Sequence, residues 1–184
     1  LFIWTGHAIR TGIYPPASSE TDRCCFGCNV TGVNNMTVFQ HADVFYQGRF
    51  QPLDVMIENG QIVQIGKSLD SGKTIDCTGK KLLPGLVELH SHGCMGYDFS
   101  TAGRDGIYTM LNYYALHGIT SVCATTMTMD LDEYEKAVRR INDVMQEAES
   151  AKQIVGINME GPFLAPAKKG AHDESFLIPL SEEI

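Results

Sequence analysis

Basic residues are scarce in this chain of 184 residues. Fourteen lysines and arginines stand against 22 aspartates and glutamates, which gives a net charge of −8 at pH 7. No run of basic residues offsets that balance, so the composition argues against a surface that binds nucleic acid. Long apolar runs are also missing, since no stretch approaches the roughly 20 residues that a membrane-spanning helix needs. With 43% hydrophobic and 20% charged residues, the composition is that of a globular protein.

The cysteines are unevenly placed along the chain. Three of the six cysteines fall between residues 24 and 28, and the others are scattered singly. A small secreted protein held together by disulfides would space its cysteines more evenly, so we expect a reducing, cytoplasmic compartment. Cys25 and Cys28 have the spacing of half a zinc site or of a redox pair, but no second ligand pair follows at a suitable distance. The interpretation we favour is therefore that this pair has no metal or redox function.

The first two regions of the chain differ in pattern. Residues 1–35 show little sustained periodicity, whereas Met36 opens a regular strand pattern, so we expect 1–35 to be a non-native or disordered extension. Residues 36–83 contain short apolar runs separated by tight-turn residues. Asn59-Gly60 between two alternating runs predicts a β-hairpin, because both turn residues must accept a positive φ. This region predicts a small all-β, β-sandwich-like domain.

From residue 84 to 184 predicted strands and helices alternate. The pattern predicts a strand at 86–90, a helix with Ile107, Met110, Leu111 and Tyr114 on one face, a strand at 120–126, a helix at 130–150 whose apolar face is Leu131, Tyr134, Val138, Ile141, Met145 and Ala148, and a strand at 154–159. Short loops between such elements are typical of parallel βα units. The fold class that we expect for this region is therefore α/β.

Two histidines form the first candidate site. In an extended segment residues i and i+2 point to the same side, so the imidazoles of His90 and His92 can face one metal ion. They lie where the first predicted strand ends, and active sites in α/β barrels form at the C-terminal ends of the strands. A His-x-His pair also occurs by chance on surface strands, but the position at a strand end favours metal binding.

A carboxylate and a lysine-containing loop follow the third predicted strand. Glu160 could be a metal ligand or an acid–base group, although a solvated glutamate is the usual alternative. Gly161-Pro162 directly after it forces a sharp exit that would hold the side chain at the end of the strand. Between Lys168 and His172 small residues would let the backbone approach a ligand closely, although lysines in loops are most often solvated.

Taken together, these segments resemble the amidohydrolase superfamily. The run LPGLVELHSHG at 83–93 is similar to the superfamily's opening strand, which a small β layer precedes. Within the superfamily, GINMEGPFL at 156–164 and KKGAH at 168–172 resemble the N-acetylglucosamine-6-phosphate deacetylase family. The resemblance covers residues 36–184.

The resemblance implies a metal-dependent (β/α)8 TIM barrel preceded by a small all-β domain. The reaction that it implies removes the acetyl group from N-acetylglucosamine 6-phosphate, a small-molecule amino-sugar phosphate. One or two divalent ions (zinc, iron, manganese or cobalt) would act as Lewis acid on the amide carbonyl and supply a hydroxide nucleophile. It further implies a homodimer, with no nucleic-acid or membrane partner.

The resemblance also assigns residues by their place in the motifs. Glu160 matches the family's metal-binding glutamate, and His90 and His92 match the superfamily's first metal-binding pair. Ala171 and His172 match a segment that contacts the amino sugar.

The family's catalytic aspartate and two further metal-binding histidines lie on later strands, so we expect none of them in this chain. A complete barrel needs about 250 residues, and 84–184 holds roughly three of its eight βα units. We therefore expect a truncated N-terminal portion that alone neither closes a barrel nor turns over substrate. Two alternatives stay open: another amidohydrolase acting on a cyclic or aryl amide, and a non-catalytic truncated product.

Overall fold

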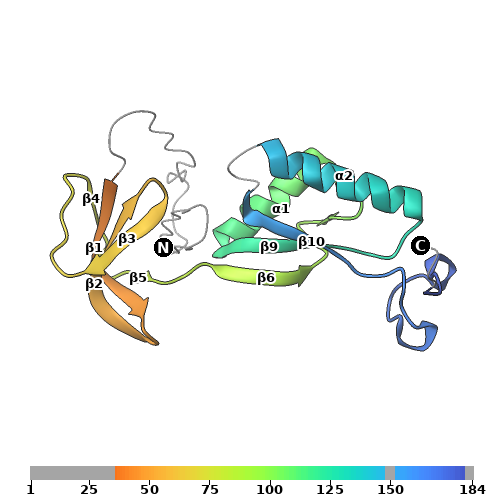
Figure 1. Ribbon diagram of the computed structural model, residues 1–184, viewed down its shortest axis with the longest axis horizontal. Coiled ribbons are helices and arrows are strands. Elements are labelled where there is room, and N and C mark those ends of the chain that lie inside the picture. The colour runs from red at the N-terminus through yellow and green to blue at the C-terminus, as the bar shows by residue number, and fades with distance from the viewer. Residues whose placement is uncertain (1–35, 148–151, 181–184) are drawn as a thin grey trace. The chain divides into compact units, whose positions relative to one another are not determined.

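The computed structural model describes residues 36–147 and 152–180, in two compact units that divide between Leu86 and Val87 (Figure 1). The expected extension at 1–35, with its cysteine cluster, lies outside the described residues. None of the described helices is long and apolar enough to cross a membrane.

The first unit is a sheet of five short strands. They are β1 (Met36–Tyr46), β2 (Arg49–Glu58), β3 (Gln61–Gly66), β4 (Thr74–Asp76) and β5 (Lys81–Leu82). The sheet has the order β3-β2-β1-β4, and β5 also pairs with β1. Its core consists of one aromatic side chain and several smaller apolar ones: Phe39, Ala42, Val44, Val55, Ile57, Cys77 and Leu82. The second layer of a β-sandwich-like domain stays a prediction.

The predicted hairpin is confirmed. β2 and β3 pair antiparallel, with Glu58 opposite Gln61 at the turn. Asn59 adopts φ 48° and Gly60 adopts φ 82°, as a two-residue turn with two left-handed positions requires. The turn chemistry therefore fixes how these two strands pair.

A buried aspartate holds an irregular part of this sheet together. The pairing of β1 with β2 shifts register between Phe39 and Ala42, and His41 adopts φ 60° there. Asp54 is 6% exposed, and its carboxylate accepts hydrogen bonds from the main-chain N–H groups of His41 at 2.9 Å and Leu69 at 3.0 Å. The carboxylate thus provides acceptors for one amide at the register shift and for one amide in the loop after β3.

We expect Asp54→Ala to lower the free energy of unfolding of this unit by about 2–4 kcal/mol, because two amides lose their acceptor. Urea unfolding followed by circular dichroism measures the loss, and amide hydrogen exchange should show faster exchange at His41 and Leu69. Asp70→Ala is the control, since among the described residues the Asp70 carboxylate accepts only an exposed local bond, from the N–H of Gly72. Equal losses in the two variants would contradict the expectation.

The second unit is an α/β layer. Its main elements are β6 (Leu86–Ser91), which begins at the division, α1 (Arg104–Leu116), β9 (Ile119–Thr126), α2 (Leu131–Glu147) and β10 (Ile154–Met159). A small hairpin, β7 (Gly93–Cys94) and β8 (Tyr97–Asp98), follows β6, and two short 3-10 turns, η2 (Pro166–Lys168) and η3 (Glu174–Phe176), follow β10. The sheet has the order β10-β9-β6, β10 pairs parallel with β9, and α1 and α2 lie on the same side of it (Figure 1). The expected α/β class is confirmed for this unit.

The inward face of α2 matches the one we expected only in part: Tyr134 and Ile141 are buried and Met145 packs against the core, as expected. Its buried residues are Tyr134, Ala137, Ile141 and Val144, whereas the expected Leu131 is 51% exposed. Ala137 is fully buried, and a small side chain there allows the helix to lie close to its neighbours. The expected face therefore missed Ala137 and Val144 and wrongly included Leu131. Residue 148 lies outside the described residues.

Candidate functional site

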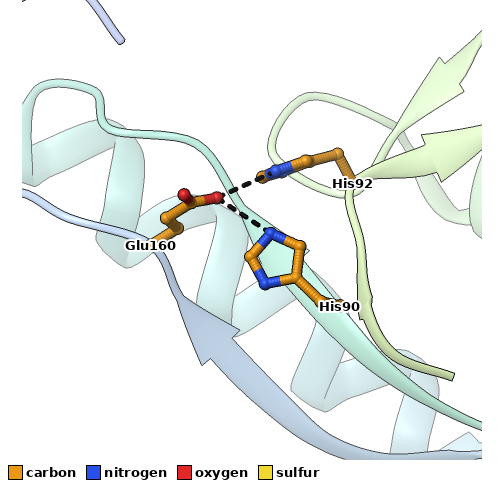
Figure 2. Close-up of side chains that lie close together, drawn as sticks. All are labelled: His90, His92 and Glu160. Carbon is orange, nitrogen blue, oxygen red and sulfur yellow. Dashed lines mark ion pairs between the residues drawn. The ribbon is translucent and has the colours of Figure 1, made fainter. Parts of the chain in front are cut away.

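Three side chains from two strand ends meet at one point. His90 lies near the end of β6, His92 follows that strand, and Glu160 comes directly after β10. The Nε2 atoms of His90 and His92 lie 3.1 and 3.0 Å from the same carboxylate oxygen, Oε2 of Glu160 (Figure 2). Each of the three residues offers one ligand atom that lies within 4.8 Å of the ligand atoms of the other two. The structure therefore brings together the histidine pair and the glutamate that the sequence singled out.

Strand alternation explains how both imidazoles face the carboxylate. Ser91 lies between them and points to the other side, where its hydroxyl is 2.5 Å from the hydroxyl of Tyr114 on α1. Burial raises the pKa of Tyr114 to about 12, with the Ser91 hydrogen bond opposing, so the phenol is neutral at physiological pH. A neutral hydrogen bond thus ties β6 to α1 while the two histidines face the site.

The main chain at Glu160 is held on several sides. Its carbonyl oxygen accepts hydrogen bonds from the hydroxyls of Tyr134 at 2.8 Å and Thr128 at 3.2 Å, and its N–H donates to the carbonyl of Thr126 at 3.3 Å. Gly161 then adopts φ 92°, a region that an L side chain rarely occupies. These contacts fix the direction in which the carboxylate leaves the strand.

His172 reaches the same carboxylate from the loop after β10. It is 6% exposed, and its Nε2 lies 3.3 Å from Oε1 of Glu160, the oxygen that does not face the histidine pair. Lys169 donates from Nζ to the carbonyl oxygen of His172 at 2.9 Å. Ala171 and Lys168 are exposed. The structure therefore places His172 in the site and Ala171 beside it on the surface.

The electrostatics of the site favour an ionised glutamate. Burial raises the pKa of Glu160, but the hydrogen bond with His172 and the electrostatic effect of the three neighbouring histidines, His172, His90 and His92, outweigh it and hold the pKa below its usual value. Glu160 is thus a carboxylate at neutral pH, which is the form that binds a cation.

The donor set fits a divalent metal. Two imidazole nitrogens and a carboxylate oxygen are the ligands that zinc and its neighbours take, at about 2.1 Å from the ion, and two such ligands lie about 3.0–3.4 Å apart. The 3.0 and 3.1 Å separations between nitrogen and oxygen fall in that range. The His90 side chain is 54% exposed and that of Glu160 30%, so a further ligand can approach from solvent.

Sequence reasoning missed three residues that support this group. Asn158 lies two residues before Glu160 on β10, and its Nδ2 is 3.3 Å from Nδ1 of His90. The i, i+2 spacing in a strand was a signal that could have found it. Thr128 and Tyr134 gave no such signal, because they reach Glu160 from the loop after β9 and from α2.

Comparison with known proteins places the chain among named relatives, although no family model matches it. It is 28% identical over 154 residues to N-acetylglucosamine-6-phosphate deacetylase from Lysinibacillus sphaericus, covering 83% of this chain and 38% of that protein. It is 32% identical over 129 residues to the enzyme of the same name from Vibrio furnissii, covering 68% and 32%. The chain therefore spans well under half the length of these relatives.

Comparison with solved structures finds proteins of the same name. A crystal structure of N-acetylglucosamine-6-phosphate deacetylase from Thermotoga maritima is 27% identical with a TM-score of 0.65, over 79% of this chain and 38% of that one. The enzyme of that name from Pasteurella multocida is 24% identical with a TM-score of 0.72, over 80% and 40%, and supports the fold alone. The resemblance that the sequence motifs indicated is thus confirmed.

Proposed function

We propose that this chain supplies part of the metal site of an N-acetylglucosamine-6-phosphate deacetylase, which releases acetate to leave glucosamine 6-phosphate. The observation that carries the proposal is the convergence of His90, His92 and Glu160 at the ends of β6 and β10. The confirmed similarity to enzymes of that name supports this activity over those of other hydrolases with the same metal ligands.

Each residue of the group has a defined task in this proposal. The ionised Glu160 and the imidazole nitrogens of His90 and His92 hold one or two divalent ions of zinc, iron, manganese or cobalt. Such an ion supplies Lewis acidity, which polarises an amide carbonyl and makes water a better nucleophile. His172, with Ala171 beside it, contacts the amino sugar from the loop that borders the carboxylate. The contacts of His172 with Oε1 and of the histidine pair with Oε2 orient the carboxylate before any ligand arrives.

The proposed activity belongs to a longer protein than this chain. β6 and β10 each pair with one neighbour only in the described sheet, and Leu86, Val87 and Leu89 of β6 are half exposed or more. Further βα units that close a (β/α)8 barrel of about 250 residues would cover this surface and bring the catalytic aspartate. We place the whole protein in the cytoplasm, as the uneven cysteine spacing predicts, and propose that it is a homodimer, as the resemblance implies. The chain alone is then inactive.

The test is release of acetate from N-acetylglucosamine 6-phosphate in the presence of Zn²⁺. The assay compares this chain with a version continued to the next in-frame stop codon of its gene. We expect acetate only from the longer version. Absence of activity in the longer, metal-loaded version would overturn the substrate assignment and favour an amidohydrolase acting on a cyclic or aryl amide. Activity in the short chain would overturn the claim that later strands are needed.

A further inference from the structure

The ring of His172 is held at both of its nitrogens. On one side Nε2 lies 3.3 Å from Oε1 of Glu160. On the other side Nδ1 lies 3.1 Å from the main-chain nitrogen of Thr128 and 2.7 Å from its hydroxyl oxygen. Both Thr128 and His172 are buried, so solvent does not compete for these contacts.

The main-chain contact determines which ring nitrogen carries the proton. A backbone N–H can only donate, so the N–H of Thr128 requires Nδ1 of His172 to offer its lone pair. In a neutral imidazole the proton then lies on Nε2, which is the nitrogen that faces Glu160. Nε2–H therefore donates to Oε1 of the carboxylate.

The hydroxyl of Thr128 links the same ring to the main chain of Glu160. Its single hydrogen can serve two acceptors, Nδ1 of His172 at 2.7 Å and the carbonyl oxygen of Glu160 at 3.2 Å. Space for this hydroxyl exists because residue 161 is glycine: a Cβ there would lie 2.0 Å from Oγ1 of Thr128. The threonine thus touches both the imidazole that binds the carboxylate and the backbone that carries it.

We propose that Thr128 is a positioning residue of the metal site. It holds His172 with its proton on Nε2, so that Oε1 of Glu160 is occupied by a hydrogen bond and Oε2 stays directed at His90 and His92. The consequence for metal affinity rests on the proposed function, whereas the position of the proton does not. Groups that orient a metal ligand in this way typically change metal affinity about 10- to 100-fold when they are removed.

The first test is 15N NMR of the imidazoles in the metal-free chain. We expect Nδ1 of His172 to resonate as an unprotonated nitrogen and Nε2 to carry the hydrogen. A proton on Nδ1 would overturn the proposal directly. This measurement does not depend on metal binding or on activity, so it decides the proton's position even if the proposed function fails.

The second test is the affinity for Zn²⁺, measured by competition with a chromophoric chelator. We expect Thr128→Val to weaken binding by about 10- to 100-fold and Thr128→Ser, which keeps the hydroxyl, to stay within about twofold of the parent chain. Thr120→Val is the matched control, because the buried hydroxyl of Thr120 has no hydrogen-bond partner within the described residues.

The outcomes distinguish the positioning role of Thr128 from the proposed function. Unchanged affinity in Thr128→Val, an equal loss in Thr120→Val, or a failure of Thr128→Ser to retain binding would each overturn the role of the hydroxyl. Circular dichroism shows whether each variant is folded, and the serine variant keeps the test valid if the valine variant is not. Absence of Zn²⁺ binding by the parent chain would count against the proposed function instead.

Discussion

Replacing Glu160 by glutamine is expected to weaken Zn²⁺ binding by at least about 100-fold, since removal of groups that merely orient a ligand already costs about 10- to 100-fold. The substitution keeps the size of the side chain but removes the charge, and Oε2 is the atom that both Nε2 atoms of the histidine pair approach. An amide also brings an NH₂ group that would repel a cation. Titration of Zn²⁺ against a competing chelator at pH 7 measures the change.

The matched control for this variant is Glu174→Gln. Glu174 is an exposed glutamate at the start of η3, in the same loop region as His172. Its substitution removes the same charge from the chain without touching the cluster, so we expect the affinity to stay within about twofold. A Glu160→Gln chain that binds Zn²⁺ as tightly as the parent would remove the metal site from consideration.

The second large effect is expected at Gly93, directly after the histidine pair. A Cβ at this position would lie 2.1 Å from the carbonyl oxygen of Tyr97 and 2.9 Å from Cα of Asp98. Both are main-chain atoms, so the β7–β8 hairpin must open before a methyl group can fit. We expect Gly93→Ala to lower the free energy of unfolding of the second unit by about 3 kcal/mol or more.

The same substitution should also weaken metal binding. The carbonyl oxygen of His92 accepts a hydrogen bond from the N–H of Phe99 at 2.7 Å, so movement of the hairpin displaces the histidine. Gly96→Ala in the same hairpin is the control: Gly96 has φ 80° but no atom within 4 Å of its Cβ position. We expect Gly96→Ala to lower the free energy of unfolding by about 1–2 kcal/mol, which is the cost of a left-handed backbone alone. Thermal and urea unfolding compare the two, and similar losses would refute the steric argument.

The three strands and two helices that form the main layer of the second unit could be predicted because each has a strong local pattern. The strand expected at 154–159 matches β10, and the one expected at 120–126 differs from β9 by one residue. The inward face of α2 could be predicted only in part: Tyr134 and Ile141 were identified, but the fully buried Ala137 was not, because burial of an alanine depends on how closely the helix packs. That packing depends on the partner surface, which the sequence of the helix does not contain.

In the candidate site, too, residues with a local sequence signal could be predicted and residues that depend on long-range contacts could not. His90, His92 and Glu160 could be found because two-residue spacing and strand ends are local properties. Thr128 and Tyr134 could not, since their hydrogen bonds to Glu160 join positions 32 and 26 residues apart. Contacts of that separation form only once β9, α2 and β10 have assembled.

The two-sided use of β6 restricts how this part of the chain can change in length. Ser91 serves the helix side and the flanking histidines serve the site, so the two functions occupy alternate positions. Loss or gain of one residue within the strand would exchange the two sides and turn the imidazoles toward α1. A change of two residues would keep the imidazoles on the side of the site and Ser91 on the side of α1. Length variation in homologous strands should therefore be even-numbered wherever both roles are kept.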